Sequence, residues 1–365
     1  MSQAGLAPRG SALGACPVPL TQAYDAALFD LDGVLYLGGE SIPHAASSVQ
    51  AALAAGMRAG YVTNNASRSP SAVAGHLREL GIPAQDAEVV TSGQAAAHHL
   101  AEHLPAGAVV LIIGTDALTE EVARRGLKPV RRCDGPLGMP AAVVQGLSPQ
   151  TAWTDLAEAA VALRHGALWV AGNADTTLPS PRGQLPGNGA FVAALRTATG
   201  REPIVVGKPS PALHAESLSR VPARRPLVVG DRLDTDVLGA VRGAADSLLV
   251  LTGVADRAAL LQAPPGSRPT YLSSDLRGLL VAHPQVVVEG ATARCGGYRA
   301  WYDGELRLNR DDGGGDGGDG PSPGDVGYDP DGHGHHADDR RGGGSSDDAL
   351  RAECALSWAL ADAAR

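Results

Sequence analysis

The sequence contains few aromatic residues and no long apolar run. Phe, Trp and Tyr account for 4% of the 365 residues whereas 44% are hydrophobic, so a core must be built mostly from Ala, Val and Leu. No stretch approaches the roughly 18 consecutive apolar residues that a membrane-spanning helix requires, which argues against a membrane protein. Residues 1–21 contain scattered Pro and Gly without a continuous apolar stretch, and we expect a disordered leader there, not a signal peptide.

The sequence also lacks an excess of basic residues and closely spaced cysteines. Its formal net charge of −9 and its pI near 5.6 argue against a nucleic-acid partner, because no basic stripe is available to neutralise phosphates. The four cysteines lie far apart and form no Cys-x-x-Cys pair. That pattern favours reduced thiols in a cytoplasmic protein and does not support structural zinc.

An apolar run that ends in two carboxylates is the most informative feature present. Residues 26–31 predict a short buried strand, and Asp30 and Asp32 lie at its carboxyl end on the same side of an extended backbone. Ligands of open α/β sheets bind at that edge. Two carboxylates held so close repel each other unless a cation or a shared proton relieves them. The pair therefore suits a Mg²⁺ site in which one Asp attacks and the other handles a proton, with a solvated acidic turn as the structural alternative.

Polar residues also follow two later strand-like runs. Thr63 and Asn64 come directly after the run 58–62, and their hydroxyl and amide groups are uncharged donors suited to phosphate oxygens. The run 227–229 is followed by an acidic cluster that opens a helix, formed by Asp231, Asp234 and Asp236. Asp234 either belongs to a site or caps that helix.

A lysine follows a further strand-like run, residues 204–206. Lys128 and Lys208 are the only lysines among 30 basic residues, and Lys208 stands in a Gly-Lys-Pro context directly after this run. A compact ammonium on a flexible stem fits between a carboxylate and a phosphoryl oxygen where a planar guanidinium does not. The choice of lysine at this position therefore favours a chemical role.

In this order and with these intervals, the four segments resemble the four motifs of the haloacid dehalogenase superfamily of phosphohydrolases. The Gly-Asp-Arg-Leu-Asp-Thr-Asp wording of the last segment is similar to subclass IIA, which includes 4-nitrophenylphosphatase, nucleotide-monophosphatase and phosphoglycolate-phosphatase-like enzymes. The resemblance covers residues 22–290 and implies an α/β fold with a doubly wound, Rossmann-like parallel sheet. About 31 residues separate Asp32 from Thr63, enough for one crossover helix, whereas about 144 separate Asn64 from Lys208. The longer interval implies an inserted α/β type-two cap domain.

The resemblance implies a role for each motif residue in catalysis. Asp30 would attack phosphorus to form an aspartyl-phosphate. Asp32 would protonate the leaving oxygen and then deprotonate the hydrolytic water. Thr63 and Asn64 would bind phosphoryl oxygens, and Lys208 would tie the phosphate to the nucleophile.

The same resemblance implies a metal site. Mg²⁺ would be held by Asp30, by Asp231 and by the main-chain carbonyl of Asp32. Asp236 would orient Asp231 or a metal-bound water.

A loop at residues 172–179 resembles the substrate-facing cap loop of the subclass. Its candidate residues are Asn173, Asp175 and Leu178. Some relatives place a histidine where this chain has Leu178, so their specificity does not transfer. A purely structural Asn/Asp turn is the alternative interpretation of this loop.

We expect the chain to be organised as a phosphatase core interrupted by the cap and followed by a small C-terminal module. The expected segments are the core (22–103 and 201–290), the cap (104–200), a hairpin around Asp303-Gly304 (291–310), a disordered Gly/Asp-rich linker (311–346) and a C-terminal helix (347–365).

These observations predict a cytoplasmic, Mg²⁺-dependent phosphomonoesterase that hydrolyses a small phosphorylated metabolite. A phosphotransferase or mutase of the same superfamily is one alternative. A catalytically retired phosphometabolite-binding protein, in which the C-terminal module does the work, is the other. The sequence leaves open the substrate, a homodimer formed through the cap, and the role of the C-terminal residues.

Overall fold

The chain divides between His283 and Pro284 into two compact units, which are described separately. The computed structural model describes residues 11–135, 137–180, 182–311 and 346–365. Residues 312–345, and with them nearly all of the expected Gly/Asp-rich linker, lie outside the described residues.

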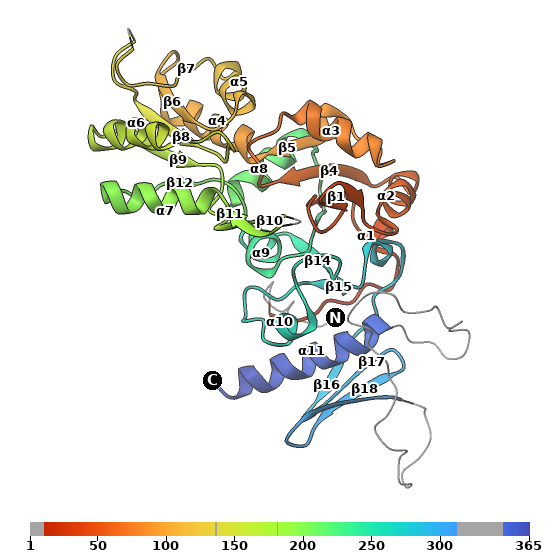
Figure 1. The fold of residues 1–365 in the computed structure, drawn as a ribbon. Coiled ribbons are helices and arrows are strands. Elements are labelled where there is room, and N and C mark those ends of the chain that lie inside the picture. Colours follow the sequence, from red (N-terminus) through yellow and green to blue (C-terminus); the bar gives the residue numbers. More distant parts are fainter. Residues whose placement is uncertain (1–10, 136, 181, 312–345) are drawn as a thin grey trace. The chain divides into compact units, whose positions relative to one another are not determined.

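The first unit contains a six-stranded parallel sheet, the core sheet, in the order β15-β14-β13-β1-β4-β5 (Figure 1). Its strands are β1 (Ala26–Phe29), β4 (Arg58–Thr63), β5 (Val89–Thr91), β13 (Pro226–Gly230), β14 (Asp246–Val250) and β15 (Tyr271–Ser273). Strand β1 pairs with β4 on one side and with β13, far away in the sequence, on the other. The chain therefore leaves the core sheet after β5 and returns to it at β13.

Helices and short turns connect the strands of the core sheet. They are α1 (Leu20–Ala23), α2 (Ala45–Ala54), α3 (Pro70–Glu79), η1 (Asp86–Glu88), α8 (Pro211–Arg220), η2 (Leu233–Val237), α9 (Leu238–Arg242), α10 (Arg257–Leu261) and η3 (Leu276–Leu280), with a two-stranded ribbon of β2 (Tyr36–Leu37) and β3 (Glu40–Ser41) after β1. Helices α3 and α8 begin at serine N-caps followed by proline, a sequence signal that fixes their first turns.

Both faces of the core sheet are covered by apolar side chains. Ala27 and Phe29 of β1 belong to one buried cluster, which also contains residues of α2, α3 and η3. Leu28 points the opposite way, into a second buried cluster with residues of α8. All four residues of β1 are buried, as a parallel strand covered on both faces requires. The expected doubly wound α/β fold is confirmed.

The N-terminal residues differ from the expected disordered leader. Residues 1–10 lie outside the described residues, but Cys16 exchanges two backbone hydrogen bonds with His283, each of 2.8 Å. Cys16 and Leu20 are buried in the first cluster of the core. Residues 11–21 are ordered because these two apolar side chains pack in the buried cluster against the core sheet. Local composition does not reveal such a long-range contact.

The inserted residues form a second parallel sheet, the cap sheet, in the order β12-β9-β8-β6-β7. Its strands are β6 (Val109–Ile113), β7 (Lys128–Val130), β8 (Ala142–Gln145), β9 (Leu168–Ala171) and β12 (Ile204–Val205), with helices α4 (Ser92–His103), α5 (Asp116–Arg124), α6 (Trp153–Arg164) and α7 (Asn188–Thr199) and a hairpin of β10 (Thr177–Ser180) and β11 (Gly183–Pro186). The expected α/β cap is therefore present, and Figure 1 shows its strands in colours from orange through yellow to green.

One local expectation about the cap is wrong. Residues 204–206 were expected to belong to the core, but Ile204 and Val205 pair with Val170 and Ala171 of β9 in the cap sheet. Helix α4 is capped by Thr91, whose hydroxyl accepts a hydrogen bond from the amide of Gln94.

One apolar cluster is shared by the core and the cap. The cluster contains Leu28 and Val62 of the core sheet together with Ile112 and Val144 of the cap sheet. Helix α4 contributes Leu100 and neighbouring alanines to it. We call this set the shared apolar cluster, and it joins the two sheets of the first unit through α4.

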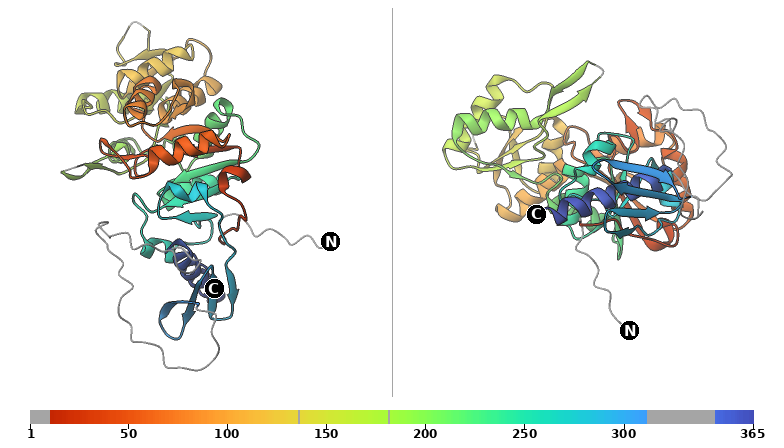
Figure 2. Two further views of the ribbon diagram at one scale, coloured as in Figure 1. Left: turned by 90° about the vertical axis from the view of Figure 1, so that its right-hand side faces the viewer. Right: turned by 90° about the horizontal axis from the view of Figure 1, so that it is seen from below.

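The second unit is a four-stranded antiparallel sheet with one helix. Its elements are β16 (Val287–Glu289), β17 (Thr292–Cys295), β18 (Tyr298–Tyr302), β19 (Leu306–Arg310) and α11 (Ser346–Ala363). The expected hairpin is confirmed as β18–β19, in which Tyr302 lies opposite Leu306 around the Asp303-Gly304 turn. The expected C-terminal helix is α11, which lies along these strands in both views of Figure 2 and buries Leu356 among their side chains.

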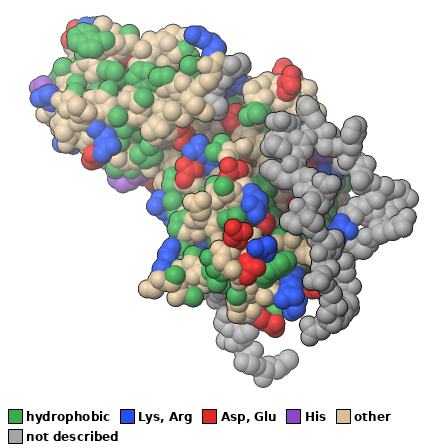
Figure 3. Space-filling model, turned by 60° about the horizontal axis from the view of Figure 1, so that its bottom comes forward, with side chains coloured by type: hydrophobic (Ala, Val, Ile, Leu, Met, Phe, Trp, Pro, Cys, Tyr) green, Lys and Arg blue, Asp and Glu red, His purple; other side chains and the backbone are tan. Residues whose placement is uncertain are grey.

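No helix among the described residues is long and apolar enough to cross a membrane. On the face drawn in Figure 3, the described Lys and Arg side chains are interspersed with Asp and Glu side chains, and no broad basic patch forms among them.

Candidate active site

The carboxyl ends of three neighbouring strands bring the expected motif residues together. Strands β13, β1 and β4 are adjacent and parallel, so the residues that follow them meet at one edge of the core sheet. These residues are Asp231 after β13, Asp30 after β1 and Thr63 at the end of β4. The amide of Asp30 still donates to the carbonyl of Val229 at 2.8 Å, which holds the start of the loop against the sheet.

Lys208 reaches this edge from the segment that returns from the cap. Its Nζ lies 2.5 Å from Oδ1 of Asp30 and 2.8 Å from Oδ1 of Asp236, and it also donates to the carbonyl of Val62 at 3.3 Å. The Lys208 residue is only 5% exposed. The lysine that the sequence singled out is therefore a buried ammonium between two carboxylates.

The site contains more negative than positive charge. One oxygen from each of Asp30, Asp231 and Asp236 lies within 4.8 Å of the other two, and Lys208 is the ammonium placed among them. Burial, together with the neighbouring carboxylates, raises the pKa of Asp30 well above its usual value although Lys208 opposes the shift. Burial and Asp236 raise the pKa of Asp231 to about 6. Burial alone would lower the pKa of Lys208, but Asp236 and Asp30 outweigh it and raise that pKa.

One carboxylate oxygen of Asp231 has no hydrogen-bond partner in the part of the chain that the structure describes. Its Oδ2 accepts a hydrogen bond from the amide of Val254 at 2.7 Å, whereas its buried Oδ1 has no hydrogen-bond partner among the described residues. Gly33 packs against the same carboxylate with a φ of +83°, and a Cβ there would lie 2.4 Å from Oδ2. A buried, unsatisfied carboxylate oxygen within a crowd of carboxylates fits a hard divalent cation such as Mg²⁺.

Asp32 and Thr63 complete the set of motif residues at this edge of the core sheet. Asp32 is exposed as a residue, yet partial burial of its carboxyl group raises its pKa, although Lys208 opposes the shift. Such a shift favours a carboxyl group that can carry a proton. Thr63 is 3% exposed, and its hydroxyl accepts a hydrogen bond from the amide of Asn65 at 3.0 Å.

The side chain of Asn64 has another use than the expected contact with phosphate. Its Oδ1 accepts from the amide of Lys208 at 2.7 Å. Its Nδ2 donates to the carbonyl of Lys208 and to Oδ2 of Asp175, both at 3.3 Å. Asn64 therefore ties the backbone of Lys208 and the cap loop to the end of β4, which leaves its main-chain amide as the group that can face a phosphoryl oxygen.

Two of the three expected cap-loop residues are brought to the site. Nδ2 of Asn173 donates to the carbonyl of Asn64 at 2.7 Å, and Oδ2 of Asp175 accepts from the side-chain Nδ2 of Asn64. Asn188, for which no sequence motif indicated a role, holds the loop by donating to the carbonyl of Asn173 at 2.7 Å. Leu178 instead lies in β10 opposite Leu185, and it is 44% exposed.

The acidic cluster after β13 splits into two roles. Asp236 accepts from Lys208 and from the amide of Arg232 at 3.2 Å, so it anchors the lysine. Asp234 neither joins the site nor caps the helix. It pairs with the Arg232 guanidinium through two hydrogen bonds of 3.0 and 2.8 Å and is largely exposed.

The main-chain amide of Val254, which holds Asp231, could not be predicted from the sequence, because any residue type other than proline supplies such a backbone donor.

Comparison with known proteins decides the family. Models of the haloacid dehalogenase-like hydrolases match residues 27–128 and 205–279. The chain is 54% identical over 260 residues to the D-glycerol 3-phosphate phosphatase of Mycobacterium tuberculosis. The matched region covers 71% of this chain and 72% of that protein. The chain belongs to the haloacid dehalogenase-like hydrolases. Within them it has the features of subclass IIA, and it is a phosphatase, as the sequence predicted.

Further similarities agree with this assignment. The chain is also 36% identical over 259 residues to the acid sugar phosphatase of Staphylococcus saprophyticus, and the match covers 70% of this chain and 97% of that protein. The crystal structure of glycerol phosphate phosphatase from Mycobacterium tuberculosis in complex with magnesium matches with a TM-score of 0.69 and 51% identity, over 76% of this chain and 85% of that one. The expected Mg²⁺ cofactor is thereby confirmed for the family, and the carboxylate cluster of this chain fits it.

Proposed function

We propose that this chain is a Mg²⁺-dependent phosphomonoesterase that uses Asp30 as its nucleophile and acts on a small phosphorylated polyol or sugar of the glycerol phosphate type. The observation on which this rests most is the cluster in which Lys208 neutralises Asp30 beside the unsatisfied oxygen of Asp231. The names of the relatives, a glycerol phosphate phosphatase and an acid sugar phosphatase, support the substrate class.

Asp30 is suited to attack phosphorus in line. Its carboxylate lies at the carboxyl edge of the core sheet, with one oxygen bound to Lys208. Attack forms an aspartyl-phosphate and releases the alkoxide of the substrate, which splits one difficult displacement into two easier ones. Asp32 gives its proton to the leaving oxygen and then takes a proton from the water that hydrolyses the acyl phosphate.

The phosphoryl oxygens are bound by groups at the end of β4 and by Lys208. The Thr63 hydroxyl and the main-chain amide of Asn64 are fixed donors, and such preorganised donors stabilise the charge that spreads over the phosphoryl oxygens in the transition state. The ammonium of Lys208 bridges the nucleophile and the phosphoryl group, while Asp236 keeps it in place from the other side.

Mg²⁺ would be held by Asp30, Asp231 and the main-chain carbonyl of Asp32. When bound, the ion neutralises charge between the nucleophile and the phosphoryl group and so stabilises the transition state. Asp231 is prepared for this role, because its second oxygen is fixed by the amide of Val254.

The two alternative functions remain distinguishable from this proposal. A phosphotransferase or mutase passes the phosphoryl group to an acceptor other than water, and a retired binding protein does not turn over at all. The complete set of chemical residues supports an active enzyme. A cytoplasmic location is supported by four free cysteines, and a homodimer through the cap stays a prediction.

The test is hydrolysis of 4-nitrophenyl phosphate and glycerol 3-phosphate in excess Mg²⁺ or EDTA. We expect release of one inorganic phosphate per alcohol, loss of turnover in EDTA, and a kcat at least about 10³-fold lower in Asp30→Asn, because an amide neither attacks phosphorus nor binds Mg²⁺ well. Asp116→Asn is the matched control, since that carboxylate is 96% exposed on α5. Activity of Asp30→Asn within tenfold of wild type contradicts the assignment of the nucleophile. Alcohol release without inorganic phosphate favours the transferase.

A further inference from the structure

A second group of metal-ligating side chains lies at the end of α4, away from the active site. His99, Glu102 and His103 occupy positions i, i+3 and i+4 of this helix, so they share one side of its last turns. Ser92, in the first turn, donates to the carbonyl of Asn64 at the active site. Since α4 has 12 residues and a length of about 18 Å, the three side chains belong to its opposite end. We call them the α4 cluster.

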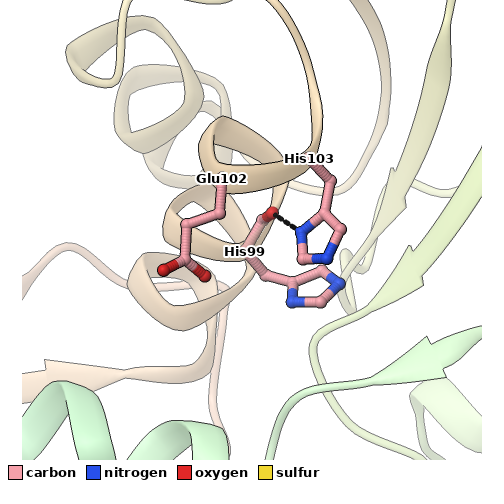
Figure 4. Close-up of side chains that lie close together, drawn as sticks. All are labelled: His99, Glu102 and His103. Carbon is pink, nitrogen blue, oxygen red and sulfur yellow. Dashed lines mark hydrogen bonds between the residues drawn. The ribbon is translucent and has the colours of Figure 1, made fainter.

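The two imidazoles of the α4 cluster lie side by side. Their ring centroids are 4.1 Å apart and the ring planes are inclined by 32°. Figure 4 shows both rings on the same side of the helix. Two histidines at this spacing on one helical face can bind one divalent ion, because both rings reach it without a change in the backbone.

The hydrogen bonds of His103 leave a lone pair for a metal. Its Nδ1 lies 2.8 Å from the carbonyl oxygen of His99. A carbonyl only accepts, so Nδ1 carries the proton and the neutral ring has its lone pair on Nε2. This is the arrangement in which a backbone carbonyl fixes the tautomer of a metal-binding histidine. Nε2 of His99 is also available, since it is buried without a hydrogen-bond partner among the described residues.

Glu102 supplies the third ligand. One of its oxygens lies within 4.8 Å of a ring nitrogen of each histidine, although Figure 4 shows the carboxylate turned away from the rings. It pairs there with Nε2 of His98 at 3.3 Å, and it is 60% exposed, so its side chain is free to turn. His98 does not join the cluster, because its Nδ1 lies 2.7 Å from Glu216 on α8.

We propose that His99, His103 and Glu102 bind a borderline divalent transition metal ion of the Zn²⁺ type, at a site separate from the carboxylate site for Mg²⁺. Two imidazole nitrogens and one carboxylate suit Zn²⁺, Ni²⁺ or Cu²⁺, whereas Mg²⁺ prefers oxygen ligands alone. The two sites of this chain are thus selective by ligand chemistry. Water completes the coordination, since His103 and Glu102 are exposed.

The test is a calorimetric titration of the full-length chain with Zn²⁺ in millimolar Mg²⁺, which occupies the carboxylate site. It is repeated in a variant with His333, His335 and His336 changed to Asn, so that these histidines of the Gly/Asp-rich segment do not contribute. We expect one Zn²⁺ per chain in that background, with an affinity at least tenfold lower in His103→Ala and in His99→Ala, and reduced in Glu102→Gln.

His165→Ala is the matched control. His165 is also exposed at a helix end, and its Nδ1 lies 2.9 Å from the carbonyl of Val161, four residues earlier, as in His103. It belongs to none of the metal-ligating groups among the described residues. Circular dichroism verifies that each variant is folded. Equal Zn²⁺ affinity in His103→Ala and wild type, or an equal loss in His165→Ala, would overturn the proposal.

Discussion

Asp231→Asn should make the metal-free protein more stable while removing its response to Mg²⁺. Asp231 is 1% exposed, and its pKa is raised from 3.8 to about 6 by burial and by Asp236. The folded protein therefore binds more protons than the unfolded chain between these values, so stability present below pH 3.8 is lost as the pH rises through about 6. At 1.36 kcal/mol per pH unit, the full cost of ionising Asp231 is about 3 kcal/mol. An asparagine has no such cost.

The assay is urea unfolding in EDTA at two pH values. Asp231→Asn should exceed wild type in the free energy of unfolding by about 1.5 kcal/mol at pH 5 and about 3 kcal/mol at pH 7.5. Excess Mg²⁺ should raise the stability of wild type and that of the variant much less, because the ion binds the folded state through this carboxylate. Asp116→Asn removes an exposed carboxylate that pairs only with Arg131 on the surface, and it should change both values by less than about 1 kcal/mol. If the variant is less stable than wild type in EDTA at pH 7.5, the carboxylates do not destabilise the metal-free protein by mutual repulsion, and the reasoning is refuted.

Three further substitutions test other parts of the site. Lys208→Arg should lower kcat at least about 100-fold, because the planar guanidinium does not fit between Asp30 and Asp236. The control is Lys128→Arg, which changes the exposed second lysine. Equal kinetics in both variants would show that the shape of the cationic group at position 208 is unimportant. Asn64→Ala should lower the free energy of unfolding by about 1–3 kcal/mol, since the amide of Lys208 loses its acceptor, and an unchanged urea midpoint would contradict this. Burial and Lys208 lower the pKa of His214 from 6.5 to about 4, so the unfolded state binds the extra proton and the free energy of unfolding falls as the pH drops through that window. The difference in this free energy between wild type and His214→Gln should therefore shrink by about 2.5 kcal/mol from pH 7.5 to pH 4.5. A constant difference would show that His214 does not titrate there.

The sequence predicted the parts of the site that depend on short runs of residues. Asp30, Thr63 and Asp231 each follow an apolar strand, and parallel pairing places the ends of such strands at one edge. The contacts of Asn64 could not be predicted, because its partners Asp175 and Lys208 lie 111 and 144 residues away. Their positions depend on the packing of the cap, which no local pattern encodes.

The remaining differences in the fold have the same origin. Residues 11–21 contain scattered Pro and Gly and no continuous apolar run, which suggested disorder, yet Cys16 and His283 pair across the unit. Residues 204 and 205 form a strand as expected, but the choice between two parallel sheets depends on which edge is free to accept it. The second unit was expected to contain one hairpin, and strands β16 and β17 extend it on the side of β18.

The shared apolar cluster limits how the cap of this protein can be exchanged for that of a relative. A chimera cut at residues 104 and 200 would separate α4 and β12 from the cap sheet on which both depend. Leu100 would then face cap residues selected against a different helix. A graft from residue 92 to residue 206 moves α4, the cap sheet and β12 together. It leaves Leu28, Val62 and their core neighbours to be matched, together with the hydrogen bonds between Asn64 and the cap loop. Recombination between members of this subclass should therefore tolerate crossovers at the two ends of that longer segment better than at the nominal cap boundaries.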